Sequence, residues 1–211
     1  MAQSAGRYAM NSFAQKVIVG ALALILPGFA EAATAVATAD LHVRSGPGPH
    51  YPVVGVIEEN GTADLVGCLA GSRWCQVTQE GTAGWSYSEY LTVDISEQSV
   101  PLSESWQGAE VPPVTYLPPA GAAAAPRVTG ALIAPPSTRV PVIAPPPPVQ
   151  TYVLDNRRDP VFLDGEVVVG AALPETVELF PVPQYEYQYA YVNQVPVLVQ
   201  PDTRRVVYVY R

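Results

Sequence analysis

Hydrophobic and polar residues alternate in short runs over residues 35–94, and turn residues separate these runs. Asn60-Gly61 and Glu80-Gly81 are clear turn signals, because glycine and asparagine tolerate the left-handed backbone that tight turns need. Short strands at regular spacing are typical of a small β-barrel or β-sandwich. The expected strands are Ala35–Arg44, Val53–Ile57, Thr62–Leu69, Arg73–Thr78, Thr82–Ser86 and Tyr90–Val93. We therefore expect an all-β domain over residues 33–94.

The alternation ends near Ile95, and a proline-rich segment, residues 95–150, follows. Thirteen of the 23 prolines lie between Pro101 and Pro148, together with an alanine run and two copies of Ile-Ala-Pro-Pro. Such a composition buries too little apolar surface to offset the entropy lost on ordering. We expect a disordered linker of polyproline II character, with a reach on the order of 100–150 Å. The alternative is a docking site for a groove that reads proline motifs.

A second folded segment is expected over residues 151–211. Asp164-Gly165 stands between two apolar triplets and predicts a β-hairpin. Four tyrosines at alternate positions place their rings on one face of a strand, which most simply indicates a packing face. These are Tyr185, Tyr187, Tyr189 and Tyr191. Turns at Asn193-Gln194 and Pro201-Asp202 complete a three-stranded antiparallel meander, whose middle strand is expected to be short or bulged at Pro196.

The first 32 residues have the three-part layout of a secretory signal peptide. A polar, basic region precedes ten apolar residues, 17–26, and Ala30-Glu31-Ala32 then forms an Ala-x-Ala cleavage site. We expect cleavage after Ala32, with Ala35 and Ala37 as alternative sites, and a periplasmic or secreted mature protein. An uncleaved anchor or a buried helix is the other interpretation, but a spanning helix needs about 20 apolar residues. No later segment resembles a membrane span.

Cys68 and Cys75 are the two cysteines of the chain. An even cysteine count in an exported protein indicates a disulfide. Each cysteine lies two positions from a valine, Val66 or Val77, so the period of a strand places both sulfurs on the valine face. Two buried free thiols are the alternative. The pair has no histidine near it and is not a metal site, because tetrahedral zinc needs three or four ligands.

Charge excludes several kinds of partner. The formal net charge is −8, and removal of the leader leaves 9 basic and 18 acidic side chains, a net charge of −9. A nucleic-acid-binding protein needs a basic stripe to neutralise phosphates, and this sequence has none. Binding to anionic lipid head groups is disfavoured for the same reason.

The string Leu41-His42-Val43-Arg44-Ser45-Gly46-Pro47 resembles the Leu-Asn-Val-Arg-x-Gly-Pro opening of bacterial SH3-like domains, with His42 in place of the usual asparagine. Other elements of that pattern follow in order: Pro52-Val53-Val54-Gly55, Gly61, Trp74-Cys75-Gln76-Val77, Gly84-Trp85 and Ser88-x-Tyr90-Leu91. The resemblance covers residues 38–93. It implies an SH3-like barrel that binds cell-wall peptides, glycans or proteins, or that serves as a spacer.

A second resemblance lies near the C-terminus, in the string Tyr191-Val192-Asn193-x-x-Pro196-Val197-Leu198-Val199-x-Pro201-x-Thr203-Arg204-Arg205-Val206-Val207. With Val169-Gly170-x-x-Leu173-Pro174 upstream, it resembles the domain-of-unknown-function 1236 family of exported Gram-negative proteins. The resemblance covers roughly residues 160–210. It implies a related fold and export, and it implies no activity.

The sequence contains no recognisable catalytic site. Both histidines, His42 and His50, lie in the first domain, and a disulfide explains the cysteines better than a Cys-His nucleophile pair does. No Gly-x-Ser-x-Gly elbow occurs, and the adjacent carboxylates of Glu58 and Glu59 flank a turn, where they are solvated. We expect a protein that is not an enzyme and that holds neither cofactor nor metal.

Surface recognition is the remaining kind of chemistry. The SH3-like resemblance places five aromatic residues around the loops that border a ligand groove: Tyr51, Trp74, Trp85, Tyr87 and Tyr90. Aromatic faces bind sugar rings and peptides without needing charge. The alternative is that the two tryptophans cap a small core.

The function expected from these features is that of a non-catalytic envelope protein. Its barrel would bind peptidoglycan or a wall-associated protein, and the linker would present the C-terminal domain at a distance. Two other classes stay open. One is a structural or stress-related exported protein whose barrel is a spacer, and the other is a regulatory subunit of a separate cell-wall hydrolase.

Overall fold

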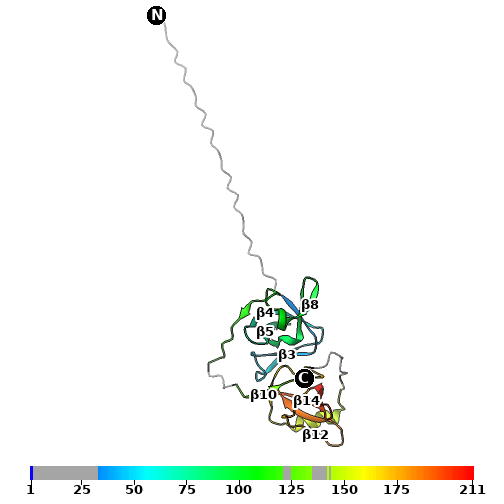
Figure 1. Cartoon of the computed structure of the whole chain (residues 1–211). Helices are drawn as coiled ribbons and strands as arrows, with labels where there is room; N and C mark the ends of the chain where they lie inside the picture. Colours follow the sequence, from blue (N-terminus) through cyan, green and yellow to red (C-terminus); the bar gives the residue numbers. More distant parts are fainter. Residues whose placement is uncertain (2–32, 121–124, 135–141, 143) are drawn as a thin grey trace. The chain divides into compact units, whose positions relative to one another are not determined.

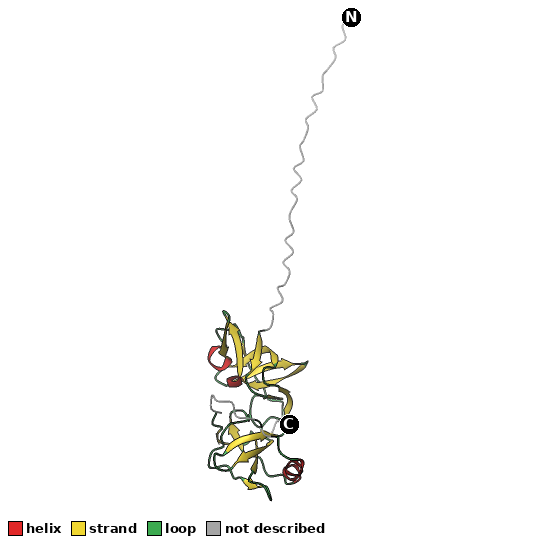
Figure 2. Cartoon of the chain, turned by 90° about the vertical axis from the view of Figure 1, so that its right-hand side faces the viewer, coloured by secondary structure: helices red, strands yellow, loops and turns green. Residues whose placement is uncertain are grey.

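The structure is a computed structural model that describes Met1 and residues 33–120, 125–134, 142 and 144–211. The rest of the expected signal peptide, residues 2–32, lies outside the described residues. Strands are the predominant regular structure of the described chain, and the helices are short (Figure 1, Figure 2). The all-β class is therefore confirmed. None of the helices in the described part is long and apolar enough to cross a membrane.

The N-terminal sheet forms the expected SH3-like barrel. Its main strands are β1 (Thr34–Ala37), β2 (Leu41–Arg44), β3 (Val53–Ile57), β4 (Thr62–Leu69), β5 (Trp74–Gln79), β6 (Thr82–Tyr87), β7 (Leu91–Ile95) and β8 (Gln98–Pro101). They lie in the order β3-β2-β6-β5-β4-β1-β7-β8, and a 3-10 helix, η1 (Ser88–Tyr90), leads into β7. Alternate apolar side chains point inward, so that Leu41, Val43, Ile57 and Val77 are fully buried. Most of these strands match the expected ranges, but the expected strand Ala35–Arg44 is divided into β1, which pairs with β4 and β7, and β2, which pairs with β3 and β6.

A β-bulge in β4 interrupts this alternation between Leu65 and Gly67. The extra residue shifts the side chains that follow it to the other face. Val66 is consequently 43% exposed, whereas Cys68 is 1% exposed. The expectation that Val66 and Cys68 share a face is wrong for this reason, although Cys75 and Val77 are both buried on β5 as expected.

The barrel domain continues well into the expected linker. After β8 come a short helix, α1 (Leu102–Ser105), and a strand, β9 (Pro113–Val114), that pairs parallel with β4. Leu102 is fully buried and Val111 is 4% exposed, and both belong to the barrel core. This stretch is ordered by packing on the barrel, which corrects the expectation of a disordered linker from residue 95.

Proline does not prevent β9 from pairing because it loses only a donor. The carbonyl of Pro112 accepts a hydrogen bond from the backbone N–H of Cys68 at 3.0 Å. Proline is tolerated in this way at the edge of a sheet. Gly67 permits the approach, since a Cβ there would lie 2.3 Å from Cγ1 of Val114.

The second half of the expected linker contributes to the C-terminal domain. Strand β10 (Val128–Ala131) pairs parallel with β11 (Phe162–Asp164). Helix α2 (Pro147–Asp155) begins with two prolines, which the first helical turn accepts because its N–H groups have no intrahelical partner. Residues 121–124, 135–141 and 143 lie outside the described residues, so the expected disorder is not tested there.

The C-terminal sheet contains the expected antiparallel meander. Strands β12 (Phe180–Pro181), β13 (Gln188–Val192), β14 (Val195–Gln200) and β15 (Arg205–Val209) lie in that order. Asn193 and Gln194 form the tight turn between β13 and β14, with φ values of 52° and 69°. The hairpin expected at Asp164-Gly165 is wrong, because β11 pairs with β10 and the next strand of the described chain, β12, begins only at Phe180.

Helix α2 packs on one face of this sheet through the expected tyrosine row. Tyr189 and Tyr191 are buried with Val149 and Val153 of the helix, whereas Tyr185 is 38% exposed because β13 begins only at Gln188. The hydroxyl of Tyr191 donates to the carbonyl of Val153 at 3.0 Å, near the C-terminal end of the helix. The row is therefore a packing face.

Candidate functional site

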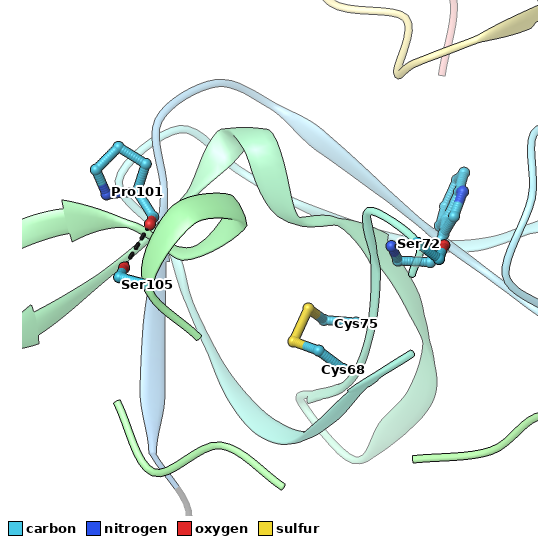
Figure 3. The surroundings of a disulfide bond; sticks show 6 residues. Cys68, Ser72, Cys75, Pro101 and Ser105 are labelled. Carbon is cyan, nitrogen blue, oxygen red and sulfur yellow. Dashed lines mark hydrogen bonds between the residues drawn. A yellow bond between two sulfur atoms is a disulfide. The ribbon is translucent and has the colours of Figure 1, made fainter. Parts of the chain in front are cut away.

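The disulfide between Cys68 and Cys75 is confirmed. The two residues are direct partners on the paired strands β4 and β5, with their Cα atoms 4.0 Å apart (Figure 3). Both cysteines are 1% exposed and belong to the barrel core. In the same region, a hydrogen bond from Ser105 to the carbonyl of Pro101 closes the first turn of α1. The Cys68–Cys75 disulfide is thus a structural crosslink inside the barrel.

The five aromatic residues expected at a ligand groove, here called the aromatic cluster, make two groups of ring contacts in the barrel domain: Trp74, Tyr87 and Tyr90 in one, and Tyr51 and Trp85, joined through Tyr116, in the other. Trp74 and Trp85 are each 5% exposed, and Tyr87 is 3% exposed. The ring of Tyr87 lies 5.5 Å from that of Trp74 and 6.3 Å from that of Tyr90. Tyr51 and Tyr90 are partly exposed, so they are the two candidates that a ligand can reach directly.

Tyr116 covers part of this cluster. Its ring lies 5.5 Å from Trp85 and 5.7 Å from Tyr51, edge to face in both contacts. Partial burial and the hydrogen bond with Tyr116 raise the pKa of the Tyr51 hydroxyl to about 12. Tyr116 could not be identified from the sequence, because it stands among prolines in the segment expected to be disordered.

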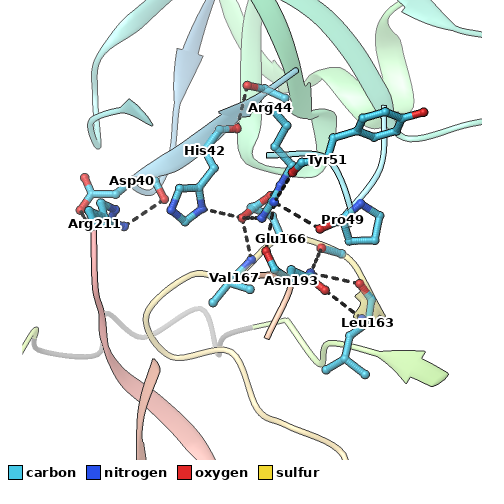
Figure 4. Close-up of polar contacts among 12 residues, drawn as sticks. Asp40, His42, Arg44, Pro49, Tyr51, Leu163, Glu166, Val167, Asn193 and Arg211 are labelled. Carbon is cyan, nitrogen blue, oxygen red and sulfur yellow. Dashed lines mark hydrogen bonds and ion pairs between the residues drawn. The ribbon is translucent and has the colours of Figure 1, made fainter. Parts of the chain in front are cut away.

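A buried polar cluster joins the barrel to the C-terminal domain (Figure 4). Glu166 follows β11 and is fully buried, as is Arg44 at the end of β2, and His42 on the same strand is 2% exposed. Nδ1 of His42 lies 2.7 Å from Oε1 of Glu166. An ionised carboxylate only accepts hydrogen bonds, so Nδ1 of the imidazole is the donor.

Arg44 engages the same carboxylate with two nitrogens. Nε donates to Oε2 of Glu166 at 3.3 Å, and Nη2 donates to Oε1 at 3.3 Å. This is the two-pronged arrangement in which a planar guanidinium matches a carboxylate. Nη1 donates to the carbonyls of Pro49, Tyr51 and Asn193 at 3.0–3.2 Å. All three guanidinium nitrogens therefore have partners.

The electrostatics of the cluster favour an ionised Glu166. Burial by itself raises the pKa of this carboxyl. The charge of Arg44 and the hydrogen bond from His42 outweigh burial, and together they lower the pKa of Glu166 from 4.5 to about 2. The carboxylate is therefore charged throughout the neutral range, and its charge is neutralised within the cluster.

Asn193 positions the segment that carries Glu166. Its side-chain oxygen accepts the backbone N–H of Leu163 at 2.9 Å, and its amide nitrogen donates to the carbonyls of Leu163 and Gly165 at 3.1 Å. The backbone carbonyl of Asn193 also accepts from Arg44. The turn after β13 is thus hydrogen-bonded both to Arg44 and to the segment that carries Glu166.

Two peripheral contacts accompany the buried cluster. Nη1 of Arg211 donates to Oδ2 of Asp40 at 2.8 Å (Figure 4), and Nε2 of Gln194 donates to the carbonyl of His50. With the cluster, they hold the C-terminal domain directly against the barrel. The expectation that the linker presents this domain at a distance is therefore corrected.

Parts of this site left signals in the sequence. His42 replaces the asparagine usual in SH3-like domains, and Arg44 belongs to the same string. Nothing in the sequence marks Glu166 as a site residue, because a glutamate after Asp164-Gly165 is indistinguishable from a solvated turn residue. In the described residues no group of three or more histidine, cysteine, aspartate or glutamate side chains is arranged to hold a metal ion.

Comparison with known families confirms both resemblances. Residues 39–92 match the family model described as bacterial SH3 domain. Residues 152–211 match the model described as domain of unknown function (DUF1236). A search of curated proteins found no match. The polar cluster accordingly connects two family modules: His42 and Arg44 lie in the first match and Glu166 in the second.

Proposed function

We propose that this protein is an exported, non-catalytic component of the bacterial cell envelope, in which the SH3-like barrel binds peptidoglycan or a wall-associated protein. The match of residues 39–92 to the bacterial SH3 domain carries the proposal, since such domains are protein-binding or wall-binding modules. The Cys68–Cys75 disulfide supports export, because disulfides persist in oxidising compartments.

Tyr51 and Tyr90 are the residues through which we propose the barrel meets its ligand. They are the partly exposed members of the aromatic cluster, and their rings supply apolar surface beside polar hydroxyls. The net charge of −9 expected for the mature chain disfavours electrostatic attraction to an anionic wall. Binding should therefore persist or strengthen slightly as salt is raised, because salt screens the repulsion.

A pelleting assay with purified peptidoglycan sacculi tests the proposal. Mature protein should sediment with sacculi, and Tyr51→Ala should weaken this retention about five- to thirty-fold, the effect of losing one ring from a stacked contact. Tyr185→Ala removes an exposed ring of the C-terminal domain and is the matched control. Circular dichroism must show both variants folded.

If the wild-type protein stays in the supernatant at every salt concentration, the peptidoglycan branch of the proposal fails. The spacer function then becomes the better account. One observation already favours that second candidate: Trp74, Trp85 and Tyr87 are almost fully buried, as core residues of a spacer would be.

A further inference from the structure

We infer that His42 and Arg44 form a carboxylate-recognition site of the barrel, and that Glu166 occupies this site as an intramolecular ligand. The inference rests on the proposed role of the barrel as the binding module and adds a ligand chemistry to it. The external ligand that fits is a peptide bearing a carboxylate, either on a side chain or at its C-terminus.

The donor side of the site matches a carboxylate group in detail. Three donors from two alternate positions of β2 converge on its two oxygens: Nδ1 of His42 at 2.7 Å, and Nε and Nη2 of Arg44 at 3.3 Å each. Arginine pairs with carboxylates in this bidentate way wherever geometry must be specific. Oε1 of Glu166, which Nη2 of Arg44 contacts, also accepts the hydrogen bond from Nδ1 of His42. These three donors together leave little room for a non-planar anion.

The barrel holds these donors with its own backbone. Nη1 of Arg44 donates to the carbonyls of Pro49 and Tyr51, which fixes the guanidinium plane. The carbonyl of His42 accepts the hydroxyl of Ser86 at 3.1 Å, and β2 pairs with both β3 and β6. A site that its own domain preorganises spends less of its binding free energy on ordering.

The acceptor side has a different character. Glu166 lies outside any strand, directly after Gly165, whose φ of 103° suits glycine. Contacts from Asn193 place this segment, but among the described residues of its own domain the carboxylate receives only one hydrogen bond, from the backbone N–H of Val167 at 3.0 Å. Glu166 therefore resembles a ligand group delivered by a loop, and its recognition comes chiefly from the barrel.

Two of the aromatic residues adjoin this carboxylate site: Trp85 of β6 is the strand partner of Arg44, and the backbone carbonyl of Tyr51 accepts a hydrogen bond from Nη1 of Arg44 at 3.0 Å. Burial first, and then the charge of Asp164, raise the pKa of Tyr87. Burial also raises the pKa of Tyr90, with the charge of Glu166 among the further contributions. The acidic segment thus lies within electrostatic reach of the rings. A peptide whose carboxylate replaced Glu166 could place its remaining atoms against the same rings.

Chemical rescue in the mature full-length chain tests the site itself. Glu166→Ala removes the carboxylate and leaves a space beside Arg44 and His42. Acetate, added against chloride at equal ionic strength, should raise the melting temperature of this variant by about 3–6 °C at a tenfold excess over its dissociation constant. Wild-type protein should show no such acetate effect.

Two further variants make the result specific. Glu166→Gln fills the space without charge, so it should melt lower than wild type and should not respond to acetate. Glu175→Ala removes an exposed glutamate of the same domain and should behave as wild type. If Glu166→Ala does not fold in chloride, the refolding yield in acetate against chloride becomes the readout.

Absence of an acetate effect on both melting and refolding of Glu166→Ala overturns the inference. Failure of the proposed function is seen separately, since wild-type protein would then not sediment with sacculi whatever acetate does. Rescue of Glu166→Ala by acetate without any wall binding would uphold the carboxylate site, while the peptidoglycan branch of the proposed function fails.

Discussion

Nδ1 of His42 lies 2.7 Å from the carboxylate of Glu166, across a sequence separation of 124 residues. Strand β2 of the barrel supplies the histidine, and the segment after β11 supplies the acid. Both side chains are almost completely removed from water. A buried charge is tolerated only when it is paired and hydrogen-bonded, so this contact makes the two family modules depend on each other.

The first prediction concerns the stability of the wild-type cluster. Glu166→Gln should lower the free energy of unfolding by about 3–5 kcal/mol, because it leaves the buried charge of Arg44 without its partner. Urea denaturation followed by circular dichroism measures this loss. Glu175→Gln, on an exposed side chain, should change stability by less than about 0.5 kcal/mol. Equal midpoints for the two variants would contradict a paired, buried Glu166.

The second prediction is that the free energy of unfolding depends on pH in the acidic range. The pKa of Glu166 is about 2 in the folded chain, against an ordinary value of 4.5. A depressed folded-state pKa stabilises the fold above the unfolded-state pKa, and this contribution is lost as the pH falls from about 4.5 toward 2. The loss should be on the order of 3 kcal/mol.

Denaturation curves between pH 6 and pH 2 check that sign. Glu166→Gln cannot titrate at this position, so its stability should fall less steeply than that of the wild-type protein over the same range. Parallel curves for the two proteins would show that the carboxyl of Glu166 is not held ionised by Arg44 and His42.

The third prediction concerns the Cys68–Cys75 disulfide. Mature protein denatured without reductant should show no reactive thiol, because Cys68 and Cys75 are bonded. Reduction should cost about 2–3 kcal/mol of stability, which is modest because the closed loop is short. Mass spectrometry after thiol labelling provides the measurement. Labelling of two thiols in unreduced protein would refute the disulfide.

The fourth prediction concerns the pairing of β9 with β4. Gly67→Ala should lower stability by about 1–3 kcal/mol, because the added Cβ would lie 2.3 Å from Val114 and 2.6 Å from the carbonyl of Pro112. The variant should also be cut by protease near β9, a region that is protected in the wild-type protein. Gly55→Ala meets no atom closer than 3.7 Å and is the control. Equal protection of residues 112–116 in both variants would argue against the β9–β4 pairing.

The strands of the barrel and the C-terminal meander could be predicted because they depend on local pattern. Alternate burial along β4 follows the polar and apolar alternation of Thr62 to Leu65. The disulfide could be predicted too, since export and cysteine count require no coordinates. The bulge at Leu65–Gly67 escaped prediction because it adds one residue to β4 opposite β5, and the local alternation of side chains does not mark that position.

By itself, the sequence determined two β modules and most of their turns, which follow from side-chain period and turn chemistry, and the bond between Cys68 and Cys75, which follows from the even cysteine count and the expected export. The tertiary structure alone decided that the stretch from Gln98 to Tyr116 is ordered and that Glu166 is buried. The physical reason is the same in both cases. A proline-rich strand and a lone carboxylate become favourable only when a partner distant in sequence supplies the missing donors, as Cys68 does for Pro112 and as Arg44 and His42 do for Glu166.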